Sequence, residues 1–315
     1  MIIACVLYAA STPAAASILP LEVVYSSQSA TKYYRVYEEK GSFYLLYASG
    51  APSGRRRSSF HLTVEAYSVA GRDVQLLENN LSTSPISWNP DDYSLQHEGA
   101  GPMVPYNGLV RSGTNQVLAT GVGAPAAIAQ SAAGERAGRL VAALDQVKSE
   151  ARIANGIDAR HVLREALLDL LKTLPAGLVG GGVGSSIVEE KKRSPALSSV
   201  RACIAEMLVA GGLLRHPLRS TEPEIRLEGV SYYEAKLPEA HAYKALVSVL
   251  DDPVAAVRVD AASALAATLS AKDELILRKL ELLACDRSLV PLNDHLRGIL
   301  QTRKLMQDCN ESGPH

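Results

Sequence analysis

Aromatic side chains are concentrated in the first part of the chain, and this uneven distribution constrains the possible folds more than any other feature. Ten of the 13 tyrosines, both phenylalanines and the single tryptophan precede residue 131 in a chain of 315 residues. Aromatic and β-branched residues favour pleated sheets, whereas Ala, Leu, Glu, Lys and Arg, which dominate later, favour helices. The sequence therefore predicts an α+β fold, with a β-rich antiparallel domain over 18–125, a helical domain over 131–308 and a flexible tail over 309–315.

Charge and hydropathy exclude two classes of protein. The chain is 47% apolar with a formal net charge of −1, so it can bury a sizeable core without a metal or disulfide. A general nucleic-acid-binding protein needs an excess of Lys and Arg to neutralise phosphates, and we expect no nucleic-acid partner. No apolar run reaches the ~18 residues of an ordinary membrane-spanning helix.

The first residues have the pattern of a secretory signal. The apolar run Ile2–Tyr8 is followed by Ser11-Thr12-Pro13 and by three alanines that end at Ala16, which is typical of a small-residue cleavage site. We expect a signal peptide over 1–17 and a secreted or periplasmic protein. The run lacks the usual preceding Lys or Arg, and the alternative is a buried first strand in a cytoplasmic protein.

Cysteine usage does not predict a disulfide framework. Cys5 would leave with the signal, and the three that remain are an odd number. Cys203 and Cys285 fall at apolar helical positions and are expected as free, buried thiols, while Cys309 lies in the polar tail. There is no Cys-x-x-Cys pair to bind zinc. We expect no metal and no cofactor.

Five segments before residue 80 have the composition of strands in an antiparallel meander, as in a curved sheet or sandwich. Phe60, Leu62 and Val64 alternate with polar residues, the pattern of a half-buried strand. Glu39-Lys40-Gly41 predicts a hairpin with a bulge. Residues 79–123 read mainly as loops, with a short strand near 116–120. The expected strands are Leu21–Tyr25, Tyr33–Glu38, Ser42–Tyr47, Phe60–Tyr67 and Val74–Leu77.

Two loops could contact an anion or a lipid. Arg55, Arg56 and Arg57 precede the fourth expected strand, and they either bind anions or lipid headgroups or form a solvated loop. Residues 176–187 are Gly-rich and uncharged. This second segment either inserts into a membrane or is a flexible loop, and it lacks the Gly-Lys-Ser/Thr end of a phosphate-binding loop. Both loops lead to the hypothesis of membrane contact.

Helical periodicity dominates after residue 131. Asp158 can cap a helix whose leucines form one stripe, and Pro195 can begin another. The expected helices are Glu135–Ala154, Ala159–Leu174, Pro195–Leu208, Pro238–Leu250, Pro253–Leu269, Asp273–Ala284 and Leu289–Gln307.

The most specific segment of the chain is 246–269. Asp252 can cap the helix that Pro253 begins, and Val257 and Leu265, eight residues apart, share one helix face. The small residue Ala261 allows close helix packing. With Val257-Arg258 and Ala264-Leu265, this segment resembles a HEAT repeat over ~30 residues.

The resemblance implies an α-solenoid that holds a protein partner on a concave helical surface. Val200-Arg201 and Met207-Leu208 repeat the spacing of Val257-Arg258 and Ala264-Leu265 more weakly. If the repeats are few and uneven, a compact helical bundle is the alternative. We expect Arg258 to support inter-repeat packing or a series of polar contacts.

Catalytic motifs are not evident. The sequence lacks His-Glu-x-x-His, Gly-x-Ser-x-Gly and the Rossmann glycines, and His161 with Glu165 reads as a surface pair four residues apart. We expect a non-enzymatic protein-binding or scaffold protein. Two alternatives stay open: a secreted or membrane-active effector that uses residues 176–187 and Arg55–Arg57, and an enzyme whose site is assembled at the domain interface.

Overall fold

A single antiparallel sheet organises the first part of the molecule. The computed structural model describes residues 18–26, 31–52, 60–83, 104–112, 115–123, 132–174, 195–268, 273–306 and 309. Six long strands and a two-residue strand form the sheet in the order β6-β5-β1-β2-β3-β4-β7. The strands are β1 (Leu21–Ser26), β2 (Thr31–Glu39), β3 (Ser42–Pro52), β4 (Phe60–Val69), β5 (Val104–Ser112), β6 (Asn115–Gly123) and β7 (Arg152–Ile153).

The antiparallel meander expected from the sequence is present in β1 to β4. The β5–β6 hairpin adds to the free side of β1, where Glu22 lies opposite Arg111. The bulge expected between β2 and β3 is absent. Glu39 pairs directly with Ser42, and Lys40 and Gly41 both have positive φ, as a two-residue turn that matches the strand twist requires.

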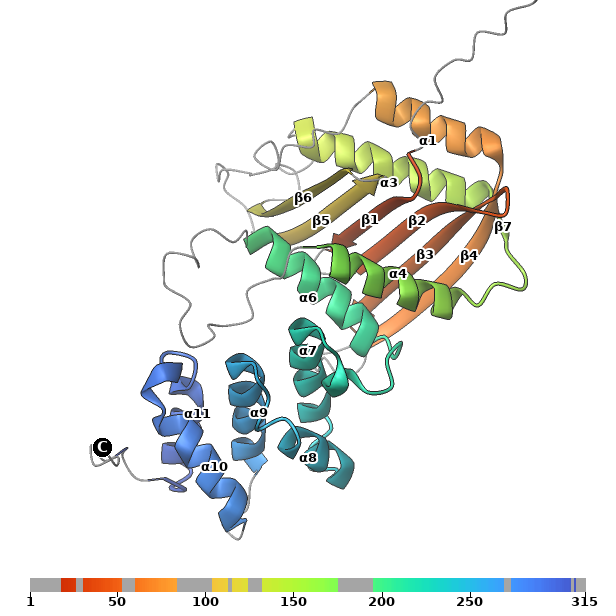
Figure 1. Ribbon diagram of the computed structural model, residues 1–315. Coiled ribbons are helices and arrows are strands. Elements are labelled where there is room, and N and C mark those ends of the chain that lie inside the picture. Colours follow the sequence, from red (N-terminus) through yellow and green to blue (C-terminus); the bar gives the residue numbers. More distant parts are fainter. Residues whose placement is uncertain are drawn as a thin grey trace, which may run out of the picture.

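Helices cover both faces of the sheet. The helices α1 and α3 lie on one face, and α4 and α6 lie on the other (Figure 1). On β2, Tyr33 and Tyr34 point to opposite faces, and both are fully buried. The bounds of these helices are α1 (Gly71–Thr83), α3 (Ala132–Glu150), α4 (Ala159–Thr173) and α6 (Pro195–Val209).

Helices from beyond residue 131 therefore complete the core of the β-rich part. Leu163, Leu167 and Leu170 of α4 are buried against the sheet, as their stripe predicted, and Asp158 accepts a hydrogen bond from the backbone nitrogen of His161. The 18–125 and 131–308 segments share two hydrophobic cores. The mixed α+β class follows directly from this arrangement.

A third core lies among the C-terminal helices. The helices α7 (Pro223–Glu234), α8 (Ala240–Val247), α9 (Ala255–Thr268), α10 (Glu274–Cys285) and α11 (Asp294–Thr302) follow α6. They extend away from the sheet (Figure 1). In chain order α6, α7, α9 and α11 contact one another, and α8 and α10 pack against α9. We call these four successively packed helices the helix row.

Several other expectations about secondary structure were wrong. The helix expected over Glu135–Ala154 ends at Glu150, because Arg152–Ile153 form β7. The expected strand Val74–Leu77 is part of α1, because Val74, Leu77 and Leu81 recur at helical spacing and pack on the sheet. The expected loop over 79–123 contains β5, which pairs along its length with β1 and β6. The sequence also gave no indication of α7.

The cysteine prediction was wrong as well. Cys285 at the end of α10 forms a disulfide with Cys309, across 24 residues of sequence. Cys203 is a buried thiol outside this disulfide, as expected. The disulfide fastens the segment after α11 to α10, so residue 309 is anchored where the sequence suggested a flexible tail.

Two tyrosines on the same face of β2 differ in whether their hydroxyl groups form a hydrogen bond, and this difference can be tested. Tyr33 donates a 2.6 Å hydrogen bond to the buried carboxylate of Glu22, whereas the hydroxyl of Tyr37 is buried without a hydrogen-bond partner. Because a lost bond to a charged group costs about 1.5–3 kcal/mol, Tyr33→Phe should lower the free energy of unfolding by that amount in urea titrations. Tyr37→Phe should leave it unchanged or raise it slightly. Equal losses in the two variants would contradict this assignment.

Candidate functional site

Buried charges form one row across the sheet. Glu22, which is fully buried, lies between Arg111 and Arg35 in the strand register. Arg111 donates a short hydrogen bond from Nε to Glu22, and Arg35 lies 3.6 Å from the other oxygen of the same carboxylate. Arg111 also reaches Asp169 and Thr173 on α4. The row therefore ties the sheet to the helix that covers it.

Tyr33 completes this cluster. Burial, and secondarily the charge of Glu22, raises the pKa of Tyr33 well above its ordinary value, so its hydroxyl remains a donor to Glu22. The carboxylate receives hydrogen bonds from Tyr33 and Arg111 and an ion pair from Arg35. Both oxygens of this carboxylate are therefore engaged, and the cluster links β1, β2 and β5.

A second set of buried charges links the helices. Arg201 of α6 is 2% exposed and donates to both oxygens of Glu224 at the start of α7, at 2.7 and 3.1 Å. Its third nitrogen donates to the carbonyls of Leu171 and Leu174 at the end of α4. One guanidinium thus joins α4, α6 and α7.

The same arrangement occurs one step further along the helix row. Arg226 of α7 donates to both oxygens of Asp252, at 2.8 and 3.1 Å, and both residues are buried. Asp252 also accepts a hydrogen bond from the nitrogen of Val254 just before α9. We call the two pairs, Arg201–Glu224 and Arg226–Asp252, the arginine ladder. Because two-oxygen pairing by arginine is strong and directional, the ladder fixes how α6, α7 and α9 align.

The hydrogen bonds of Arg258 are more local in the sequence than expected. Its Nη1 donates to the carbonyls of Asp252 and Pro253, at 2.6 and 3.3 Å, in the turn before its own helix. The contact between helices is made instead by the side chain of Asp252 with Arg226. Arg258 therefore lies beside Asp252. It supports the turn that carries Asp252 and does not itself bridge two helices of the ladder.

The end of the helix row is held by side chains that donate hydrogen bonds to backbone carbonyls. Asn293, fully buried just before α11, donates to the carbonyls of Leu283, Ala284 and Asp286. Arg297 adds two hydrogen bonds to the carbonyl of Ala284. These donors satisfy carbonyls at the end of α10 that the helix itself leaves unpaired.

The residues of the HEAT-like segment belong to the third core or to the turn before α9. Val257, Ala261 and Leu265 are completely buried in the third core, and Pro253 is exposed in the turn before α9. Residues 55–57 and 176–187 lie outside the described residues, so the structure does not bear on the anion and lipid hypotheses. Sequence reasoning missed Glu224, Arg226 and Glu22, although the spacing of Val200-Arg201 did single out Arg201.

His161 and Glu165, four residues apart on α4, form a surface pair as expected. Arg164 lies against His161 and Glu165 on the exposed side of α4, as a surface network. No group of three His, Cys, Asp or Glu side chains within the described ranges could hold a metal ion. Within those ranges no helix is both long and apolar enough to cross a membrane.

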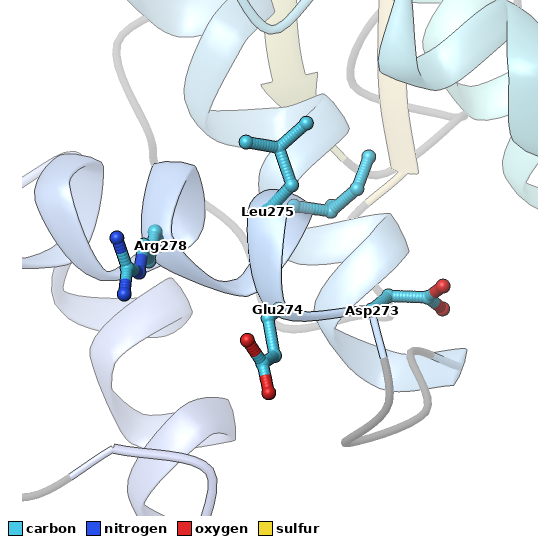
Figure 2. A pocket seen from close by; sticks show the side chains of 5 residues that line it. Asp273, Glu274, Leu275 and Arg278 are labelled. Atoms are coloured by element: carbon cyan, nitrogen blue, oxygen red, sulfur yellow. The ribbon is translucent and has the colours of Figure 1, made fainter.

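An open cavity lies at the start of α10. It measures about 530 Å³ and is lined by Asp273, Glu274, Leu275, Ile276 and Arg278. Figure 2 shows Glu274 and Arg278 pointing away from Leu275. Asp273 accepts a 3.4 Å hydrogen bond from Tyr243 of α8. The cavity combines an apolar side with charged margins and is open to solvent.

Comparisons with protein families, with curated proteins and with solved structures give no match to this chain.

The arginine ladder predicts which substitution destabilises the helix row. Asp252→Ala leaves the buried Arg226 without its partner, and losing one member of a buried pair costs about 3–5 kcal/mol. Arg258→Ala removes hydrogen bonds to two carbonyls and should cost about 1 kcal/mol. Equilibrium unfolding in urea measures both free energies, and an Arg258→Ala loss equal to that of Asp252→Ala would refute the assignment.

Proposed function

We propose that this chain is a non-enzymatic binding or scaffold protein whose helix row holds a protein partner. The observation that carries the proposal is that α6, α7, α9 and α11 pack side by side in succession, with buried ion pairs that link α6, α7 and the turn before α9. Rows of this kind present a continuous surface built from several helices. HEAT-like stacking, with α8–α9 and α10–α11 as helical pairs, is part of the proposal.

We infer that the partner surface is the side of the row formed by α7, α9 and α11. These helices contact one another in succession, whereas α8 packs on α7 and α9, and α10 packs on α9 and α11. Closer spacing on one side of a two-layer stack curves the stack toward that side. The α7–α9–α11 side is therefore the concave one in this proposal, as expected for an α-solenoid.

The electrostatics of Asp260 support a position on α9 that faces α7 and α11. Asp260 is exposed. Desolvation raises its pKa, and the nearby charge of Glu234 on α7 adds to the shift, whereas His295 on α11 acts in the opposite direction. Because charged groups of both neighbouring helices act on Asp260, we take its side chain as the centre of the proposed partner surface.

The disulfide supports the proposed location of the protein. Disulfides form and persist in oxidising environments and are rare in the cytosol. Cys285–Cys309 therefore favours a secreted or periplasmic protein, in agreement with the signal-like residues 1–17. We propose this location together with the binding function.

Capture of the partner tests the proposal. A tagged full-length protein, crosslinked in its native extract, should recover one stoichiometric protein partner detectable by mass spectrometry. Asp260→Arg inverts the charge at the centre of the proposed surface and should lower recovery at least about tenfold, equivalent to ~1.4 kcal/mol. The matched control is Lys244→Glu, an exposed charge reversal on α8, which should leave recovery unchanged.

Two results would contradict the proposal. Recovery of no protein partner would refute the scaffold function. Equal recovery by wild type and Asp260→Arg would show that the partner binds elsewhere. Circular dichroism of both variants establishes that the fold is retained.

A further inference from the structure

The two ends of the sheet differ in how they are protected. At one end, β4 carries His61 and Glu65 and pairs at Tyr67 and Ser68 with the short strand β7. At the other end, β6 is the last strand of the described sheet (Figure 1). It is nine residues long and contains neither a charged residue nor proline. Sheets commonly protect an edge by short length, charge or proline, and β6 itself has none of the three.

The hairpin of β5 and β6 determines which backbone groups of β6 point outward. Ser112 lies opposite Asn115, so two residues connect the strands. A pair that flanks a two-residue turn is hydrogen-bonded, and hydrogen-bonded pairs alternate along an antiparallel ladder. The same alternation follows, strand by strand, from the hydrogen bond between Ala154 and Ala66 at the other edge. The residues whose N–H and C=O groups point to the free edge are therefore Gln116, Leu118, Thr120 and Val122.

We propose that this edge pairs antiparallel with β6 of a second copy of the chain, about a two-fold axis at Ala119. In this register Gln116 lies opposite Val122 of the other copy, and Leu118 lies opposite Thr120. Each such pair exchanges two hydrogen bonds, and the symmetry makes every pair twice. All four outward-pointing residues are thereby satisfied. At the axis, alanine meets alanine in a closely spaced, non-hydrogen-bonded pair, which suits a small residue.

The absence of charge around the axis favours pairing with an identical strand. Residues 112–134 contain no Lys, Arg, Asp or Glu, so the two-fold axis brings no like charges of this segment together. Arg111 on β5 is engaged with Glu22 of β1, on the side of β5 away from β6. This inference goes beyond partner binding and does not depend on it, because the proposed partner surface is on α7, α9 and α11.

Sedimentation tests whether the second copy binds. Analytical ultracentrifugation of the full-length chain over about 1–200 µM should show a dimer whose fraction rises with concentration. Because each copy contributes one β6 edge to a closed two-fold contact, association should stop at the dimer. Monomer at every concentration would overturn the proposal, and so would assemblies larger than a dimer.

Hydrogen exchange of the unaltered protein tests the register. The amides of Leu118 and Thr120 point to the free edge, so they should exchange at least about tenfold more slowly in concentrated than in dilute protein. The amides of Val117 and Ala119 bond to β5 and should be equally protected at both concentrations. Protection of all four amides that does not change with concentration would contradict the pairing.

Charges introduced at the axis test its position. Ala119→Lys and Ala119→Glu each place like charges opposite each other in the dimer and should weaken dimerisation at least about fivefold. An equimolar mixture of the two variants should dimerise again, because lysine then faces glutamate across the axis. The matched control is Thr63→Lys, an exposed position on β4 at the other end of the sheet, which should leave dimerisation unchanged.

Three results with these variants would contradict the proposed axis. They are a dimer that persists in Ala119→Lys, a mixture that stays monomeric, and an equal loss of dimer in Thr63→Lys. Circular dichroism of each variant establishes that the fold is retained. Partner capture by the same variants is a separate readout, so loss of dimerisation and loss of partner binding are distinguishable.

Discussion

The guanidinium of Arg201 lies where the layer over the sheet meets the helix row, and the rest of the structure depends on that junction. It satisfies the carbonyls of Leu171 and Leu174 at the end of α4 and pairs with Glu222 and Glu224 beside the start of α7. Burial alone lowers the pKa of Arg201, but the two carboxylates outweigh this effect. The side chain therefore remains charged inside the protein and fixes the direction in which the helix row leaves the sheet.

Buried charge has the same role in both halves of the molecule. Across the sheet, Glu22 is held between Arg111 and Arg35, and along the row Asp252 is held by Arg226. In each case both oxygens of the carboxylate are engaged by neighbouring donors or cations. Buried pairs of this kind specify alignment more than they add stability. Fixed alignment of the helices is what the proposed binding surface requires.

The sequence predicted elements whose stabilising contacts are local or periodic. The β1–β4 meander follows from alternation and aromatic composition, and α4 follows from its leucine stripe and the cap at Asp158. The helix α7 was missed because Glu224 and Arg226 are polar residues at buried positions, which interrupts the apolar periodicity. Strand β5 was missed because its stability comes from pairing with β1, far away in the sequence.

The candidate site was predictable only in part, for a related reason. Val257, Arg258 and Asp252 were identified from a contiguous repeat-like segment. The partner of Asp252 is Arg226, 26 residues away in sequence, and no local spacing indicates that pair. The disulfide was missed because an odd cysteine count says nothing about which thiols come close in the fold. That β6 forms an edge of the sheet depends on the order of the strands, which the local sequence of β6 does not reveal.

Hydrogen exchange of an Arg201→Met variant tests the central claim most directly. The account predicts that backbone amides of α7 and α9 lose protection while those of β1–β4 retain it, because the junction is broken and the sheet is not. Arg215→Met, a change of an exposed arginine, provides the control and should leave protection unchanged. Unaltered protection of α7 and α9 in Arg201→Met would contradict the account.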